Sequence, residues 1–235
     1  MLGESLRAIL ERLSPSDKVL DVGGWWAPFT RADWVMDLMP YETRGDGGRH
    51  GAAEERFTAA TWIQRDICDR EPYPFDDGEI DFVVCSHTLE DVRDPLWVCA
   101  EMTRIGKAGY IEVPSRLEEQ AYGFQGPWTG WGHHRWLIDV AGGGIDFVFK
   151  HHVVNGRDTD RFPPGFQQAL SEEQRVQTLW WEGPFPVRER VFVEADELDA
   201  YVAGFVAAHR DEVAVARPPG RARRLMNRAR ERLGG

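Results

Sequence analysis

Short apolar runs alternate with amphipathic stretches through the first half of the chain. Residues 2–13 place apolar side chains at helical spacing, which predicts an amphipathic helix. The runs that follow have the length of strands, and the fourth is apolar at almost every position, as expected for a strand buried on both faces of a parallel sheet. The predicted strands cover residues 18–22, 34–38, 61–67, 81–86 and 110–113, and a second helix covers residues 96–105 and ends at Lys107-Ala108-Gly109. Strands that alternate with helices or loops predict an open, mostly parallel α/β sheet.

The second half of the chain has an antiparallel character. A hairpin with a triple-glycine turn is predicted over residues 134–150, and a second pair of strands over residues 177–181 and 187–193. A helix is expected from Ala195 to about His209, and residues 123–132, rich in glycine and tryptophan, are expected to form a long loop. The sequence therefore predicts antiparallel C-terminal strands and a β-hairpin extension added to the parallel sheet.

These patterns divide the chain into three parts. Residues 1–155 form the predicted α/β core, residues 156–216 a C-terminal α/β extension packed on it, and residues 217–235 a basic tail. The tail holds seven arginines against one Glu231, a formal balance of +6; the whole chain carries −11, so the first 216 residues carry −17. We interpret the tail as a solvated helix or a helix docked on the acidic body, with an anion-binding segment as the alternative.

Composition excludes several classes of protein. With 42% apolar and 11% aromatic residues, the chain has ample side chains for a buried core. No apolar run approaches the roughly 18 residues of a membrane helix, and the charged residues within Met1–Leu13 argue against a signal peptide. The formal charge of −11 argues against nucleic acid and anionic membranes as partners. Cys68, Cys85 and Cys99 lie in apolar surroundings without CxxC spacing, so we expect buried thiols in a reducing cytoplasm.

Polar residues close four of the predicted strands, at the edge where open α/β sheets bind ligands. The first strand ends in Asp21-Val22-Gly23-Gly24, the second at Asp37, the third at Asp66-Ile67 and the fourth at Ser86-His87. Glycine allows a sharp turn close to a ligand, and a carboxylate can accept hydrogen bonds from both hydroxyls of a ribose. An acid beside an apolar residue, as in Asp66-Ile67, suits the amino group and the ring face of adenine. Four such strand ends in this order predict a nucleoside site.

The motifs that carry these residues resemble those of the class I S-adenosylmethionine-dependent methyltransferases. The motifs are Val19–Gly23, Asp37, Asp66-Ile67 and the block Pro74–Val92 (PFDDGEIDFVVCSHTLEDV), and the likeness spans roughly residues 18–113. The chain is most similar to the small-molecule branch related to the ubiquinone and menaquinone methyltransferases. The resemblance implies a Rossmann-like fold and S-adenosylmethionine as cofactor. It places Asp21, Gly23 and Gly24 around the methionine part, Asp37 and Leu38 at the ribose, Asp66 and Ile67 at the adenine, and Ser86 and His87 beside the sulfonium.

The first turn departs from the family's usual D-x-G-x-G-x-G pattern. Trp25 and Ala27 stand where the pattern has its second and third glycines. Only 14 residues separate Gly23 from Asp37, too few for a crossover helix and a strand, so that helix is expected to be shortened to about a turn or absent. Residues 41–57 are likewise expected to replace a helix with a loop, and Asp91 stands where the family often has a histidine. Trp25 and Trp26 are interpreted either as packing residues or as a stacking wall for the adenine or the acceptor.

A methyl transfer needs an aligned acceptor and, when the acceptor is a protonated hydroxyl or amine, a base. The candidate bases are His87, His133, His134 and Glu112. No metal site is expected, because adjacent histidines on a strand point to opposite faces, so His133-His134 and His151-His152 would each offer one ligand to a common site. The aromatic residues expected to wall an acceptor pocket are Trp128, Trp131 and Trp136.

The sequence thus predicts a cytoplasmic S-adenosylmethionine-dependent methyltransferase for a small-molecule acceptor of natural-product or surface-glycan type. A catalytically inactive protein of the same fold, serving as a binding or scaffolding partner, is the alternative that the Trp25 and Ala27 replacements motivate. A nicotinamide-dependent oxidoreductase lacks its G-x-G-x-x-G motif here. An RNA methyltransferase finds support only in the basic tail. No membrane partner is expected, and a homodimer is left open beside a monomer.

Overall fold

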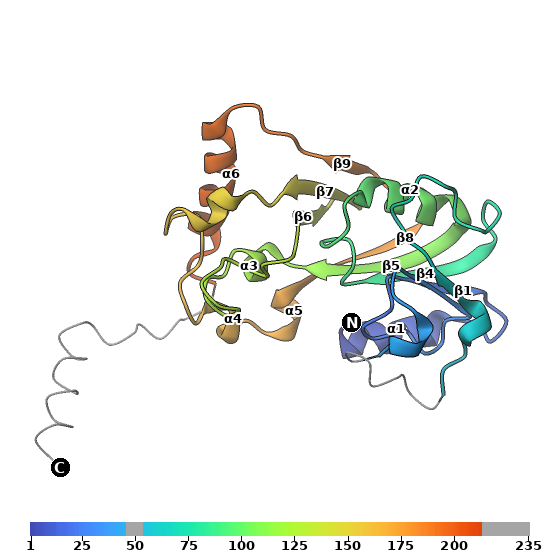
Figure 1. The fold of residues 1–235 in the computed structure, drawn as a ribbon. Helices are drawn as coiled ribbons and strands as arrows, with labels where there is room; N and C mark the ends of the chain where they lie inside the picture. Colours follow the sequence, from blue (N-terminus) through green and yellow to red (C-terminus); the bar gives the residue numbers. More distant parts are fainter. Residues whose placement is uncertain (46–53, 213–235) are drawn as a thin grey trace, which may run out of the picture.

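The computed structural model describes residues 1–45 and 54–212. The predicted basic tail, residues 217–235, lies outside this range. The described residues form two sheets with helices around them (Figure 1). Within the described part of the chain, no helix is long and apolar enough to cross a bilayer.

The main sheet has six strands in the order β3-β2-β1-β4-β5-β8. Its first five strands are parallel to one another, and β8 runs antiparallel to β5. The strands are β1 (Val19–Val22), β2 (Trp34–Asp37), β3 (Trp62–Gln64), β4 (Ile80–Ser86), β5 (Gly106–Pro114) and β8 (Val176–Glu182). The prediction of a mostly parallel α/β sheet with an antiparallel C-terminal strand is confirmed.

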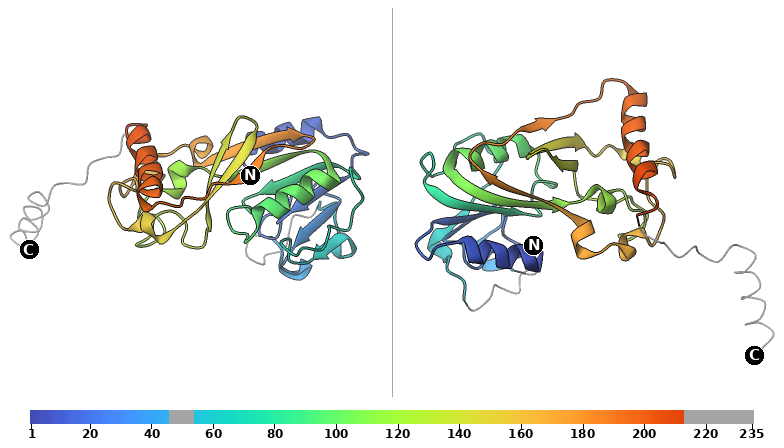
Figure 2. Two further views of the ribbon diagram at one scale, coloured as in Figure 1. Left: turned by 90° about the horizontal axis from the view of Figure 1, so that it is seen from above. Right: turned by 180° about the vertical axis from the view of Figure 1, so that it is seen from behind.

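The second sheet contains the predicted hairpin. The strands β6 (Trp136–Ala141) and β7 (Gly144–Phe149) are antiparallel, and a third strand, β9 (Val187–Glu189), runs parallel to β7. Gly142 and Gly143 have φ values of +58° and +75°, which side chains with a Cβ rarely adopt, and this explains the glycine turn. Figure 2 shows the hairpin and β9 beside the main sheet.

The predicted pairing of residues 177–181 with residues 187–193 is wrong. The first segment extends the main sheet as β8, whereas the second contributes β9 to the small sheet. β8 pairs with β5 over seven consecutive residues, because β5 offers a long free edge and because Leu179 and Trp181 are buried there in the core. Gly183, with a φ of +66°, and the prolines on either side of Phe185 then lead the chain away from β8.

Helices cover both faces of the main sheet. α1 (Gly3–Arg12) and α2 (Pro95–Ile105) lie on opposite faces (Figure 1). Ile9 of α1 packs with Val19 and Phe82, whereas Met102 of α2 packs with Leu20. Alternate side chains of the parallel strands therefore enter two separate hydrophobic clusters, as expected for a sheet buried on both sides. No helix connects β1 to β2, so the short connection predicted there is confirmed.

The start of β5 differs from the prediction that Lys107-Ala108-Gly109 ends a helix. These residues belong to the strand, which begins at Gly106. A Cβ on Gly106 would lie 2.7 Å from the side chain of Val83, and a Cβ on Gly109 would lie 2.5 Å from the ring of Trp181. The two glycines are therefore needed for close packing across the strand rather than for stopping a helix.

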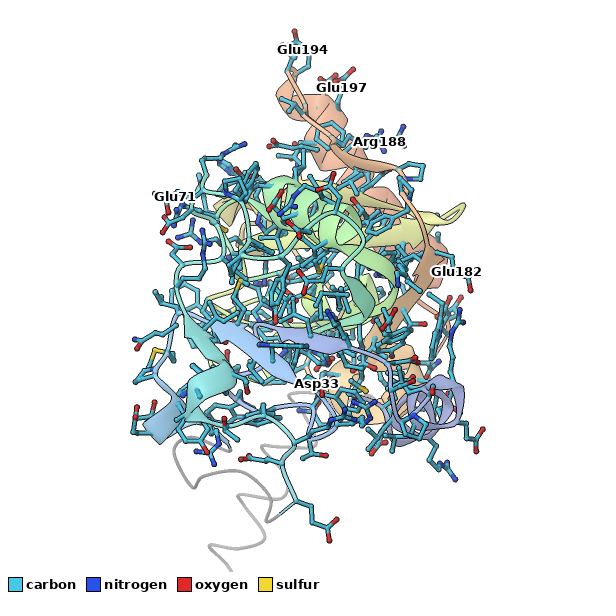
Figure 3. All side chains as sticks on the ribbon, turned by 90° about the vertical axis from the view of Figure 1, so that its right-hand side faces the viewer. Asp33, Glu71, Glu182, Arg188, Glu194 and Glu197 are labelled. Carbon is cyan, nitrogen blue, oxygen red and sulfur yellow. The ribbon has the colours of Figure 1, made fainter. Side chains whose placement is uncertain are left out.

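The helices α3 (Arg116–Glu119), α4 (Phe166–Ala169) and α5 (Glu172–Arg175) lie at the end of the molecule away from α1 (Figure 1). Single 3₁₀ turns occur at η1 (Tyr41–Thr43) and η2 (Ala59–Thr61), between β2 and β3, and at η3 (His152–Asn155), after β7. The predicted C-terminal helix is confirmed as α6 (Ala195–His209). Glu194 and Glu197 at the start of α6 project from the same end of the molecule as Arg188 of β9 (Figure 3). Cys68, Cys85 and Cys99 are buried free thiols, as predicted.

Candidate functional site

The turn after β1 is tightly constrained. Gly23 has a φ of +79°, and a Cβ there would lie 2.2 Å from the side chain of Thr88. A Cβ on Gly24 would lie 2.1 Å from Oδ2 of Asp21. Gly23 therefore brings the backbone close to the loop after β4, and Gly24 brings it close to the Asp21 carboxylate, so both positions require glycine.

The buried Asp21 carboxylate contacts the backbone of this turn and of the segment that follows it. Its side chain is 3% exposed, and Oδ2 accepts a hydrogen bond from the backbone N–H of Phe29 at 2.8 Å. Burial raises the pKa of Asp21 to about 7, because it disfavours the charged carboxylate more than the hydrogen bond from Phe29 favours it. Asp21 is thus placed to support the connection that follows β1.

Asp37 lies at the carboxyl end of β2, as predicted. Its Oδ2 accepts from the backbone N–H of Trp25 at 3.0 Å, and its Oδ1 from that of Met39 at 2.8 Å. Burial raises the pKa of Asp37, although these backbone donors oppose the shift. A carboxylate has about four lone-pair sites, so each oxygen can still accept a further hydrogen bond.

Large apolar side chains are exposed beside Asp37. Trp26 is 58% exposed and Leu38 is 62% exposed. Trp25, in contrast, is half-buried and packs in a core cluster, while its Nε1 donates to Oγ1 of Thr43 at 3.0 Å. Of the two tryptophans, Trp25 is a packing residue and Trp26 is free to contact a ligand.

Asp66, after the third strand, already has hydrogen-bond partners within the protein. The Asp66 carboxylate forms an ion pair with Arg93 and accepts from the backbone N–H of Cys68 at 2.8 Å. Burial raises the pKa of Asp66, but the hydrogen bonds from Arg93 and Cys68, together with the nearby arginine charges, outweigh it, and the net pKa is lowered. Ile67 is 6% exposed and packs in the core, so its side chain does not face the solvent.

His87 and Glu112 form a pair at the carboxyl ends of β4 and β5. His87 Nε2 lies 3.1 Å from Glu112 Oε1, and Ser86 Oγ donates to the same oxygen at 3.4 Å. Glu112 is fully buried and also accepts from the Tyr110 hydroxyl and from the backbone N–H of Leu2. Burial acts against both charges, yet the pair's hydrogen bonds prevail: the pKa of His87 rises to about 9 and the pKa of Glu112 falls to about 2. At neutral pH, His87 is therefore cationic and Glu112 anionic.

The other candidate bases lie in a neighbouring cluster. His133 and His134 belong to a turn before β6 rather than to a strand, so the predicted opposite orientation of the two side chains is wrong. Asp91 Oδ1 lies 3.9 Å from Nε2 of each ring. His134 Nδ1 lies 2.6 Å from Oε1 of the buried Glu119, and this contact raises the pKa of His134 against the effect of burial.

Several acidic residues of this region were missed by the sequence analysis. Glu90 and Glu119 are each 1% exposed, and Glu90 Oε1 lies 3.5 Å from His87 Nδ1. Glu119 follows the fifth strand within Ser115–Gln120, a polar run at the strand end. The sequence analysis chose Glu112 at the end of the fifth strand, and the polar run that follows this strand is the signal that could also have identified Glu119.

The three tryptophans of the expected acceptor wall have different roles. Trp136 is 6% exposed, packs in the core and donates its Nε1 to the carbonyl oxygen of Val92 at 2.8 Å. Trp131 stacks on His134 with ring centroids 5.8 Å apart. Trp128 is 53% exposed. Trp128 and Trp131 therefore stay available to an acceptor, whereas Trp136 is mainly a core residue.

A hollow of about 860 Å³ opens beside the N-terminus of α2. Its lining includes residues 68–70 and 93–97, together with Trp136 and Glu189. It adjoins Asp66 along the chain, but it does not include the ends of β1 and β2. The hollow is therefore next to the nucleoside positions predicted from the sequence and does not coincide with them.

Comparison with known proteins gives a family match within the first half of the chain. Residues 41–111 match the family described as methyltransferase domain. No curated protein matches the sequence. The matched range contains β3, β4, α2 and the first part of β5. It includes Asp66, Ser86 and His87.

Solved structures resemble this chain over about half of its length. One is a chain from a complex of the Haloferax volcanii Trm112 methyltransferase activator with a methyltransferase: identity is 20%, coverage is 50% of this chain and 51% of that one, and the TM-score is 0.35. The second is an S-adenosylmethionine-dependent methyltransferase from Mesorhizobium loti, with 17% identity, coverage of 64% and 65%, and a TM-score of 0.35. The third is an S-adenosylmethionine-dependent methyltransferase from Aquifex aeolicus, with 15% identity, coverage of 50% and 68%, and a TM-score of 0.32.

This chain spans about half the length of the Haloferax volcanii chain that it resembles. The fold follows from the strand order of this protein. The order β3-β2-β1-β4-β5 of its parallel strands is that of the doubly wound α/β fold. The strand order shows a Rossmann-like fold, and residues 41–111 within it match the methyltransferase-domain family.

Proposed function

We propose that this protein is an S-adenosylmethionine-dependent methyltransferase that modifies a small-molecule acceptor of natural-product or surface-glycan type in the cytoplasm. The observation that carries the proposal is the position of Asp37. Its half-buried carboxylate ends β2 beside the Gly23-Gly24 turn and beside the exposed Leu38. Carboxylate, close backbone and apolar surface are the three features that a nucleoside requires at this edge of the sheet.

The residues at the strand ends fit the cofactor. Asp37 would accept the ribose hydroxyls on its remaining lone pairs, and Leu38 would cover one face of the adenine. Gly23 and Gly24 would let the backbone of the turn approach the methionine part closely, and the packing of Thr88 and Asp21 against them leaves no space for a Cβ at either position. Asp66 would accept from the adenine amino group on the lone pairs that Arg93 leaves free. Ile67 would contribute through the core under the adenine position rather than through direct contact.

The chemistry divides between the cofactor and the side chains. The cofactor supplies an electrophilic methyl group when bound. The protonated His87, held between Glu112 and Glu90, would place a positive charge beside an acceptor oxygen, with the Ser86 hydroxyl next to it. His133 and His134 are the groups proposed to take up a proton from the acceptor. Glu112 is less suited to this role, because its pKa of about 2 makes it a weak base.

Calorimetric titration with S-adenosylhomocysteine tests the cofactor site. Asp37→Asn should weaken binding at least tenfold. Asp33→Asn is the matched control, because Asp33 accepts a backbone N–H from Val19 at 2.9 Å at the opposite end of β2. This variant should bind as the wild-type protein does. The absence of binding to the wild-type protein at millimolar ligand would exclude the proposed function.

A second candidate is a protein of this fold that binds without methyl transfer. The observation that favours it is the engagement of Asp66 by Arg93 and of Asp37 by the backbone of Trp25. Incubation with a methyl-labelled donor and fractions of small-molecule extract distinguishes the two. Incorporation of label supports the enzyme, whereas calorimetric binding without incorporation supports the binding protein.

A further inference from the structure

One cluster within residues 1–45 and 54–212 brings two histidines and a carboxylate together. One ligand atom from each of Asp91, His133 and His134 lies within 4.8 Å of the other two. Asp91 is 41% exposed and His133 is 60% exposed, while His134 is 7% exposed. The cluster is thus open to solvent on one side and anchored in the protein on the other.

The two loops that carry these residues are held together independently of the cluster. Asp91 lies in the turn between β4 and α2, and the histidines lie just before β6. The backbone N–H of Arg135 donates to the carbonyl oxygen of Glu90 at 2.7 Å, and Trp136 Nε1 donates to the carbonyl oxygen of Val92 at 2.8 Å. The two acceptors, in Glu90 and Val92, flank Asp91 in sequence, and the two donors, in Arg135 and Trp136, directly follow His134. The two loops are therefore joined next to the ligand-bearing residues by hydrogen bonds that do not involve them.

The orientation of the His134 ring is fixed by a contact of its Nδ1 atom, on the side away from Asp91. Glu119 Oε1 lies 2.6 Å from His134 Nδ1, and Lys150 Nζ donates to the other Glu119 oxygen at 2.6 Å. A carboxylate on Nδ1 favours the tautomer that carries its proton there, which leaves the Nε2 lone pair directed at Asp91. Histidine ligands of metals are usually held by such a carboxylate or carbonyl partner.

A second independent observation is the buried Glu90. Its side chain is 1% exposed, and its Oε2 has no hydrogen-bond partner among the described residues. Glu90 directly precedes the proposed ligand Asp91 in the chain. A buried carboxylate oxygen without a partner next to the cluster favours a cation there.

We propose that Asp91, His133 and His134 bind a divalent transition-metal ion of the Zn²⁺ class. Imidazole nitrogen with carboxylate oxygen is a donor set that Zn²⁺ accepts at about 2.0–2.2 Å. Ligand atoms of a tetrahedral site then lie about 3.4 Å apart, and the two contacts of Asp91 in this structure are 3.9 Å long. Rotation of the exposed His133 and Asp91 side chains that moves their ligand atoms by about 0.5 Å closes the difference for these two contacts. Three protein ligands leave a position for water or for an acceptor oxygen.

Titration calorimetry with Zn²⁺ alone tests the site on full-length protein that carries no polyhistidine tag and has been stripped with a chelator. The wild-type protein should bind one equivalent. His133→Ala and Asp91→Asn should each weaken binding at least tenfold, and both residues are exposed enough for these variants to fold. His152→Ala is the matched control, because His152 is also exposed and also has a histidine neighbour. It should leave the affinity unchanged.

Substitution with Co²⁺ gives a second readout of the same site. The visible d–d bands of a protein-bound Co²⁺ should appear in the wild-type protein and disappear in His133→Ala. Equal Zn²⁺ affinities for the wild-type protein, His133→Ala and Asp91→Asn would overturn the proposal, and so would an equal loss in His152→Ala. These outcomes are separate from the titration with S-adenosylhomocysteine, so either proposal can fail without the other.

Discussion

Nε2 of His87 lies 3.1 Å from Oε1 of Glu112, and this contact joins the loop after β4 to the end of β5. His87 has a φ of +54°, in a region that residues other than glycine rarely occupy. Glu90 Oε1 contacts the other ring nitrogen, so the imidazolium bridges two carboxylates. The proximity of these acids explains why the loop holds a cation in a conformation that costs backbone energy.

Replacing His87 with asparagine should make the stability difference from wild type depend on pH. The pKa of His87 is raised from 6.5 to about 9, so its contribution is full below pH 6.5 and is lost as the pH rises through 9. The pKa of Glu112 is lowered from 4.5 to about 2, so its contribution is present above pH 4.5 and is lost as the pH falls through 2. Urea unfolding should therefore show the largest destabilisation between pH 4.5 and 6.5 and a small one at pH 9.5. Asparagine is chosen because it tolerates a positive φ.

The control for this experiment is His152→Asn, whose ring contacts no carboxylate among the described residues. Because His87 is 42% exposed, added salt should also reduce the effect of His87→Asn. A destabilisation that is the same at pH 5.5 and 9.5 would mean that the pair contributes through packing and not through charge.

Gly23→Ala should destabilise the protein by more than its backbone conformation alone explains. A Cβ at Gly23 would meet Thr88 at 2.2 Å, whereas a Cβ at Gly78, which also has a positive φ, meets nothing within 4 Å. Gly78→Ala therefore isolates the conformational cost, of about 1 kcal/mol. The additional overlap in Gly23→Ala should add about 2 kcal/mol, measured by urea unfolding. Equal losses for the two variants would show that Thr88 moves aside without cost.

Arg93→Ala should separate stability from cofactor binding. Arg93 is 51% exposed and Asp66 30% exposed, so the loss of their ion pair should change the free energy of unfolding by less than about 1 kcal/mol. If Asp66 accepts from the adenine amino group, a carboxylate freed from Arg93 should bind S-adenosylhomocysteine a few-fold more tightly. Arg70→Ala is the matched control, since Arg70 pairs with Asp94 in the same region. Weaker binding by Arg93→Ala alone would indicate that Arg93 itself contacts the ligand.

The parallel sheet could be predicted because its strands are short, apolar and closed by polar residues. β1 and β4 bury side chains on both faces, and that leaves a plain signal in the sequence. The partners of β8 and β9 could not be predicted in this way. Their pairing depends on which free edge lies nearby after folding, namely β5 for one and β7 for the other. Local alternation of apolar and polar residues carries no information about that choice.

The candidate site was predictable in its positions but not in its contacts. Asp37 and Ser86 lie at strand ends as the order of motifs implied. The ion pair between Asp66 and Arg93, in contrast, joins residues 27 apart whose meeting depends on the fold of the loop after β4. The conformation of the His133-His134 turn likewise depends on contacts with that loop, so a strand pattern assumed from sequence gave the wrong orientation.

Arg116 should be the residue on which the docking of α6 depends most. Its guanidinium is 4% exposed and lies 4.0 Å from the ring centroids of both Tyr201 and Phe205 of α6. It also donates to Oε1 of Gln120 at 2.6 Å and to Oδ2 of Asp139 at 3.3 Å. Arg116→Ala removes the donor of the buried Gln120 Oε1 and the packing against both rings, while Asp139 keeps its bond from the Tyr201 hydroxyl, and the change should cost about 3 kcal/mol in urea unfolding.

Arg116→Lys tests which property of the arginine matters. Lysine keeps the charge but loses the planar group that stacks between two rings and bonds to several acceptors, so most of the loss should remain. Arg161→Lys is the comparison, because Arg161 lies 3.9 Å from the ring centroid of Tyr122 yet is 18% exposed and contacts one ring only. That change should cost less than about 1 kcal/mol. A stability of Arg116→Lys equal to wild type would show that the charge near Asp139, and not the stacking on Tyr201 and Phe205, holds α6 against α3.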